Sequence, residues 1–191
     1  MKIDYNAPVI LSYTLIAVGV MVLSTITGGS STTGFFTIHP GLSLLSISTY
    51  FRLFSHVIGH ANWAHLVGNF SLILLIGPLL EEKYGSMFML FMIMVTAFVT
   101  GVLNVMFFTT GLYGASGVVF MLILLSSLSR VKSGHIPLTF ILVVVLFIGK
   151  EIIDSFRPDG ISQFAHIAGG ICGSVFGFLK REKEVQIQTE L

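Results

Sequence analysis

The sequence predicts an all-α polytopic membrane protein with six transmembrane helices and both termini in the cytoplasm. Hydrophobic residues make up 54% of the 191 residues and charged residues only 10%, against about 25% charged residues in a typical soluble domain. Six stretches are apolar over most of the roughly 17–25 residues that a helix needs to cross the hydrocarbon core. The basic residues are unequally divided between the two sides that these stretches define, and this inequality sets the orientation.

The first segment, 8–27, contains no charge, because no charged residue occurs between Asp4 and Arg52. It lies where a signal peptide would lie, but it is long for one, and the residues at its end (ITGG) form no clear cleavage site. We therefore expect a retained membrane anchor. The connection 28–60 starts polar and becomes amphipathic, which predicts a structured loop in the outer membrane interface.

The other five segments are apolar stretches separated by short polar connections. They span residues 61–80, 86–108, 114–129, 136–153 and 162–179. The stretch 114–129 would be only about 24 Å long as a helix. Its N-terminus is therefore expected to begin below the outer surface, in a polar cavity that water can reach. Residues 1–180 then form one membrane domain, and 181–191 form a charged cytoplasmic tail for which we expect no regular structure.

The orientation follows from the ten basic residues. With the N-terminus in the cytoplasm, seven of them fall on the inner side and three on the outer side, as the positive-inside rule favours. The inner set is Lys2, Lys83, Arg130, Lys132, Lys180, Arg181 and Lys183, and the outer set is Arg52, Lys150 and Arg157. The second, fourth and sixth segments then run from the outer face inward.

Composition also excludes several classes of site. The net charge of +1 offers no basic surface for nucleic acid. The single cysteine, Cys172, excludes an internal disulfide and a cysteine-based zinc site, and we expect it to be a packing residue. His56, His60 and His65 are alternative metal ligands, but their spacing fits no standard site, so no metal is expected. The acidic pair 81–82 is expected in a solvated or ion-paired loop.

Polar side chains inside membrane segments are costly and therefore mark candidate functional sites. Four of them lie about one to two turns or less below the outer edge: His65, Asn69, Ser116 and His166. Taken singly, such a serine usually bonds back to a helix carbonyl, and such a histidine usually pairs with a neighbouring helix. Their common depth on three helices that run in one direction predicts a single site.

Small residues explain how the serine and the histidine could meet. Gly169, Gly173 and Gly177 repeat at every fourth position on the helical face that also carries the histidine. Such stripes let helix backbones approach closely. Gly114 and Gly117 flank the serine, so the fourth segment is a suitable partner for this stripe.

The predicted chemistry is that of a serine hydrolase. An imidazole within hydrogen-bond reach of a hydroxyl activates that hydroxyl as a nucleophile, which gives Ser116 and His166 their roles. His65 and Asn69 share one helical face and could donate hydrogen bonds to an oxyanion, together with the serine's own amide at a helix N-terminus. No acidic residue lies at this depth near the histidine, so the sequence predicts a dyad and not a triad.

At these residues the chain resembles the rhomboid family of intramembrane serine proteases. Four blocks carry the resemblance in the family's order: 52–60 (RLFSHVIGH) with His65 and Asn69, 81–85 (EEKYG), the GxSG motif at 114–117 (GASG), and 165–173 (AHIAGGICG). Together they cover about residues 50–178. The GxSxG elbow of the α/β-hydrolases is excluded, because position 118 is valine.

The resemblance implies a rhomboid-type bundle in which Ser116 is the nucleophile, His166 is the general base and later the general acid, and His65 and Asn69 belong to the oxyanion hole. It implies partners that are transmembrane protein substrates embedded in membrane lipid. These substrates would pass between the second and fifth segments and be cut near the outer membrane surface. No metal or cofactor is implied. The small six-helix form is similar to bacterial members, which act in the plasma membrane.

Two positions depart from the family's pattern. The first loop often has Trp-Arg in the family, whereas here Phe51 precedes Arg52. Many bacterial members have a tyrosine four residues after the nucleophile, and here that residue is Phe120. We expect the phenyl ring to pack under His166 without the hydroxyl, so the departures bear on the rate and the pH optimum.

Two other functions are alternatives to that of a protease. A rhomboid-like protein that binds membrane helices without cutting them usually lacks the serine or the histidine, and this chain has both. A small transporter or channel would predict charged residues or broken helices near the bilayer midplane, which is largely apolar here.

Overall fold

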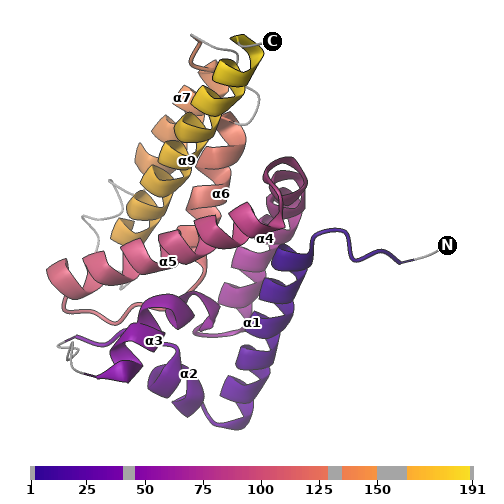
Figure 1. Cartoon of the computed structure of the whole chain (residues 1–191). Coiled ribbons are helices and arrows are strands. Elements are labelled where there is room, and N and C mark those ends of the chain that lie inside the picture. Colours follow the sequence, from indigo (N-terminus) through magenta and orange to yellow (C-terminus); the bar gives the residue numbers. More distant parts are fainter. Residues whose placement is uncertain (1–2, 41–45, 129–134, 150–162, 190–191) are drawn as a thin grey trace.

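The computed structural model describes residues 3–40, 46–128, 135–149 and 163–189 (Figure 1). Regular structure in this part of the chain is helical apart from one isolated β-bridge. The helices are α1 (Pro8–Ile26), α2 (Ser30–Phe35), α3 (Ile47–Ser55), the 3₁₀ turn η1 (His56–Ile58), α4 (Trp63–Tyr84), α5 (Ser86–Phe107), α6 (Ser116–Leu128), α7 (Leu138–Val143), the π-helical turn η2 (Val144–Ile148) and α9 (Gln163–Thr189).

The helices follow the predicted apolar segments. By length and composition, α1, α4 and α5 could each cross a membrane, while α6, the stretch Leu138–Phe147 and the stretch Gln163–Leu179 are apolar but shorter. The all-helical prediction is confirmed for the described residues, and six membrane crossings with cytoplasmic termini stay a prediction. The end of the fifth segment and the basic residues Lys2, Arg130, Lys132, Lys150 and Arg157 lie outside the described residues.

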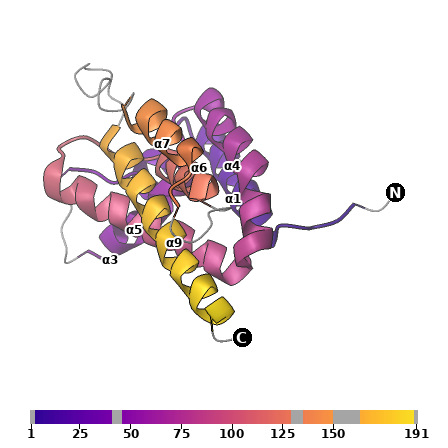
Figure 2. The same ribbon diagram turned by 90° about the horizontal axis from the view of Figure 1, so that it is seen from above.

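Helix α6 lies at the centre of the bundle. Ten of its 13 residues are buried, because the helix is apolar on every side and is covered by α4, α5, α7 and α9. Figure 2 shows α6 between α7 and α9 on one side and α4 on the other. A residue at either end of α6 is therefore held by the whole bundle.

Helices α6 and α9 are in close backbone contact through the glycine stripe. A Cβ added at Gly169 would fall well inside the van der Waals radius of the Gly117 carbonyl, and one at Gly173 would meet the Met121 carbonyl in the same way. No side chain larger than hydrogen fits at either position unless the helices separate. The stripe thus sets the distance between the helix that carries Ser116 and the one that carries His166.

A buried carboxylate joins α4 to α1. The two oxygens of Glu81 accept hydrogen bonds from the amides of Val9 and Ile10, each at 2.9 Å. The expectation of a solvated or ion-paired loop for this residue is wrong, because α4 continues to Tyr84 and turns Glu81 toward α1. First-turn amides have no partner within their own helix, and the helix dipole favours a negative group beside them.

The long connection 28–60 is structured, as predicted, and contains α2, α3 and η1. Its segment before α3 forms the β-bridge: Ile38 and Leu112 exchange two backbone hydrogen bonds of 2.9 and 3.0 Å. Both side chains are buried in a small cluster with Leu53 and Ala165. The first loop is therefore fastened to the chain just before α6.

At the other end of the chain, α9 continues to Thr189. The expectation of a tail without regular structure is wrong for the backbone of residues 181–189. The physical reason is local, since this stretch is rich in lysine, arginine, glutamate and glutamine, which are strong helix formers.

Candidate active site

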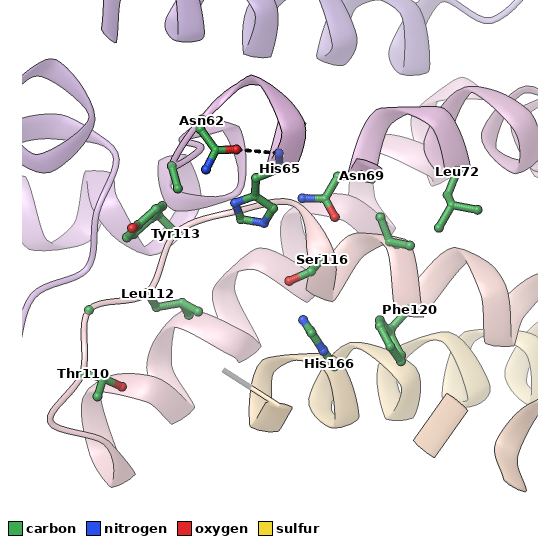
Figure 3. A pocket seen from close by; sticks show the side chains of 13 residues that line it. Asn62, His65, Asn69, Leu72, Thr110, Leu112, Tyr113, Ser116, Phe120 and His166 are labelled. Carbon is green, nitrogen blue, oxygen red and sulfur yellow. Dashed lines mark hydrogen bonds between the residues drawn. The ribbon is translucent and has the colours of Figure 1, made fainter. Parts of the chain in front are cut away.

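A pocket of about 680 Å³ contains all four polar residues that the sequence placed at one depth. Figure 3 shows Ser116 at its centre, with His166 on one side and His65 and Asn69 on the other. These residues come from α6, α9 and α4. The other residues that line the pocket are Ala61, Asn62, Leu72, Thr110, Gly111, Leu112, Tyr113, Val119 and Phe120.

Ser116 is the first residue of α6, and the turn before it depends on a glycine. Gly114 has φ +122°, a conformation that residues with a Cβ rarely adopt. A Cβ at this position would also lie 2.8 Å from Cε1 of His65. The Gly114 amide donates a hydrogen bond to the His56 carbonyl at 2.9 Å. At the start of α6, the Val119 amide donates a hydrogen bond to the Ala115 carbonyl. The Ser116 amide therefore belongs to the first turn, where amides have no partner within the helix.

His166 lies one turn into α9 and stacks on the ring of Phe120. The ring centroids are 4.6 Å apart and the planes differ by 8°. Phe120 also makes an edge contact with Phe147 of η2, at 5.9 Å between centroids. In Figure 3 the imidazole lies beside the phenyl ring and next to the serine.

His65 and Asn69 lie on the pocket face of α4, as their spacing predicted. Helix α4 begins next to the pocket because Asn62 caps it, with Oδ1 accepting from the His65 amide at 2.9 Å (Figure 3). The Asn69 side-chain amide lies 3.2 Å from Nε2 of His60, and the His65 ring packs edge-on against the same histidine, with centroids 5.0 Å apart.

Two histidines behind the pocket received no structural role in the sequence analysis. His60 also lies 3.4 Å from the backbone nitrogen of Ala115. His56 contacts the Arg52 carbonyl through Nδ1 at 3.2 Å and the Thr100 hydroxyl through Nε2 at 3.3 Å. Burial lowers the pKa of both imidazoles to about 4, which keeps them neutral.

From the sequence, these histidines were interpreted only as alternative metal ligands. Within the described residues, no three His, Cys, Asp or Glu side chains are grouped to hold a metal. The four-residue spacing of His56 and His60, directly before a helix that carries two polar pocket residues, was the signal for a supporting role.

The segment between α5 and α6 forms a further wall that the sequence analysis did not single out. Residues 110–113 line the pocket. Leu112 is held by the bridge to Ile38, and the Thr110 carbonyl accepts from Nδ2 of Asn104 at 3.1 Å. Nothing in its composition distinguishes this short connection from an ordinary loop.

The fold and the pocket define a class: helical membrane proteins that hold a serine and a histidine in one pocket within the bundle. Sequence comparison identifies the family within this class. The family model described as Rhomboid domain matches residues 47–183, and the chain therefore belongs to the rhomboid family. It is also 27% identical over 136 residues to the Rhomboid protease GlpG of Haemophilus influenzae, a match that covers 69% of this chain and 70% of that protein.

Proposed function

We propose that the protein is an intramembrane serine endopeptidase that cleaves transmembrane-helix substrates near the outer face of the membrane. Its proposed location is the plasma membrane of a bacterium, with both termini in the cytoplasm. The proposal is supported by membership of the rhomboid family and by similarity to a rhomboid protease. The observation that carries it is the pocket in which Ser116 and His166 face each other, opposite His65 and Asn69.

In the proposed mechanism the two residues act as a dyad. His166 takes the proton of Ser116, which attacks a carbonyl in an unwound stretch of the substrate helix, and the imidazole then gives the proton to the leaving amine. Water resolves the acyl-enzyme by the same acid–base steps. Asn69, His65 and the Ser116 amide stabilise the oxyanion, which carries charge only in the intermediate and its transition states.

Substrates are proposed to reach the pocket from the lipid, between α4 and the helix formed by α7 and η2. No residue of α7 is buried, and η2 is a π-helical turn, a rare geometry that often occurs at functional sites. The contacts that hold this helix include two ring pairs, Phe147 with Phe120 and Phe140 with Phe178. Few buried contacts are typical of segments that open locally. Residues 150–162, between this helix and α9, lie outside the described residues.

A fluorophosphonate probe tests for an activated serine without knowledge of the substrate. We expect the purified wild-type protein to be labelled, and the labelling to be lost in both Ser116→Ala and His166→Ala. Labelling that survives in Ser116→Ala would show that another residue is the nucleophile. Absence of labelling in a protein shown by its thermal melt to be folded would instead favour a rhomboid-like protein that binds membrane helices without cutting them.

A further inference from the structure

His60 lies behind the pocket and contacts each group proposed to stabilise the oxyanion, or its immediate neighbour. Its Nε2 faces the side-chain amide of Asn69 at 3.2 Å and the backbone nitrogen of Ala115 at 3.4 Å. Its ring packs edge-on against His65. It is 1% exposed, so it does not itself line the pocket and cannot reach a substrate.

The hydrogen-bond partners of His60 define one tautomer. Nδ1 lies 3.3 Å from the Ile58 carbonyl, which can only accept, so Nδ1 carries the proton. Nε2 then has only a lone pair, and its two partners must be donors. The Ala115 amide is a donor, and Asn69 must turn its NH₂ group, not its oxygen, toward the ring.

We propose that His60 is a positioning residue that aligns the oxyanion hole by acting as a neutral acceptor for two donors at once. One hydrogen of the Asn69 NH₂ group is held by the imidazole, which directs the second toward the pocket. The Ala115 amide is held in the same way, which orients the peptide that follows, the one that carries the Ser116 amide. The inference rests on the proposed function and adds a residue to it that does not touch the substrate.

Neutral His60 is what this arrangement requires. A protonated ring would present an N–H group to two other N–H donors and would repel them. Burial lowers the pKa of His60 to about 4, with a smaller effect of the same sign from His65, so the acceptor is retained at neutral pH. His65, on α4, is the titratable neighbour in ring contact with it.

The test compares His60→Leu, which has no acceptor, with His60→Gln, whose amide oxygen can take the place of Nε2. Kinetics are measured on a transmembrane substrate in liposomes. We expect kcat of the leucine variant to fall about tenfold or more with KM within about twofold, because oxyanion contacts act only in the transition state. The glutamine variant should recover most of kcat. Equal loss in both variants, or a change mainly in KM, would overturn the proposal.

A double-mutant cycle with Asn69→Ala separates positioning from general stability. If His60 acts largely through Asn69, His60→Leu should cost much less kcat in the Asn69→Ala background than in the wild type. Additive losses would overturn the proposal. Tyr13→Phe is the matched control, because it removes a buried hydrogen bond to the Val57 carbonyl near His60 without contact with the pocket residues. It should lower the melting temperature and leave kcat unchanged.

Three further outcomes each have a defined consequence. If His60→Leu is unfolded at the assay temperature, His60→Met takes its place, since a thioether fills the space but accepts hydrogen bonds only weakly. If the wild type shows no turnover that depends on Ser116, the proposed function fails, and this inference fails with it. Turnover that depends on Ser116 but is indifferent to His60 overturns the inference alone.

Discussion

A ring stack on Phe120 helps to orient the proposed base. Phe120 lies parallel to the imidazole of His166 and has no hydroxyl to donate to it, so the ring is held by packing alone on that face. Phe120 is itself buried and braced by Phe147. The shape and position of this phenyl group therefore contribute to the orientation of the base.

We predict that Phe120→Ala lowers kcat/KM by about two- to tenfold, since an aromatic pair contributes roughly 0.5–1.5 kcal/mol beyond its buried area. Phe120→Tyr keeps the stack and should retain activity close to that of the wild type. The measurement is the rate of fluorophosphonate labelling together with kcat/KM on a transmembrane substrate. Full activity in the alanine variant would show that the stack does not orient His166.

At the scale of elements, the contact between α6 and α9 is the interface on which the dyad depends. We predict that Gly169→Ala abolishes most of the activity and lowers stability by about 1–3 kcal/mol, the usual cost of overpacking. The added methyl would meet the Gly117 backbone, which cannot move aside as a side chain can.

Gly68→Ala is the control for this prediction, because a Cβ at Gly68 on α4 meets nothing within 4 Å. It should retain activity and stability. The measurements are the melting temperature in detergent and the rate of substrate cleavage. Wild-type activity in Gly169→Ala would show that the helices can separate without consequence for the dyad.

The helix formed by α7 and η2 is the element that we expect to move. Leu72 of α4 lines the same pocket as Phe120, and Phe147 of η2 is in ring contact with Phe120. In a Cys172→Ser background, cysteines at these two positions joined by a short bifunctional maleimide should abolish cleavage of helical substrates. Labelling by the small fluorophosphonate probe should persist. Undiminished cleavage after complete cross-linking would exclude lateral access between α4 and η2.

At the scale of the whole molecule, His56 and His60 couple stability to pH. Their pKa is lowered from 6.5 to about 4 by burial. Above pH 6.5 the folded and unfolded states are both neutral at these sites, so stability does not vary with pH through them. Between pH 6.5 and 4 the unfolded state binds protons that the folded state does not, and stability falls as the pH falls.

We therefore predict that the melting temperature in detergent decreases progressively from pH 6.5 toward pH 4. His56→Gln and His60→Gln remove a titrating group and should each reduce this decrease relative to the value at pH 7.5. A melting temperature independent of pH over this range would contradict the burial of neutral imidazoles. The same decrease in both variants would assign it to carboxyl groups instead.

Much of the element structure was predictable because apolar length is a local property of the chain. The segments expected at 8–27 and 86–108 became α1 and α5 with ends that differ by no more than one residue. The second segment was expected to end at 80, but α4 continues to Tyr84. This extension could not be inferred from hydropathy, because it depends on Glu81 being buried against the first turn of α1.

The sequence by itself determined the helical class, the main apolar segments and the set of four polar residues at one depth. Each of these depends on composition and spacing along one segment. Only the tertiary structure decided that Glu81 joins α4 to α1 and that His60 contacts both Asn69 and the turn before Ser116. These contacts depend on how each helix is rotated about its axis and how closely it approaches its neighbours. Both are set by packing across the bundle, between residues far apart in the chain.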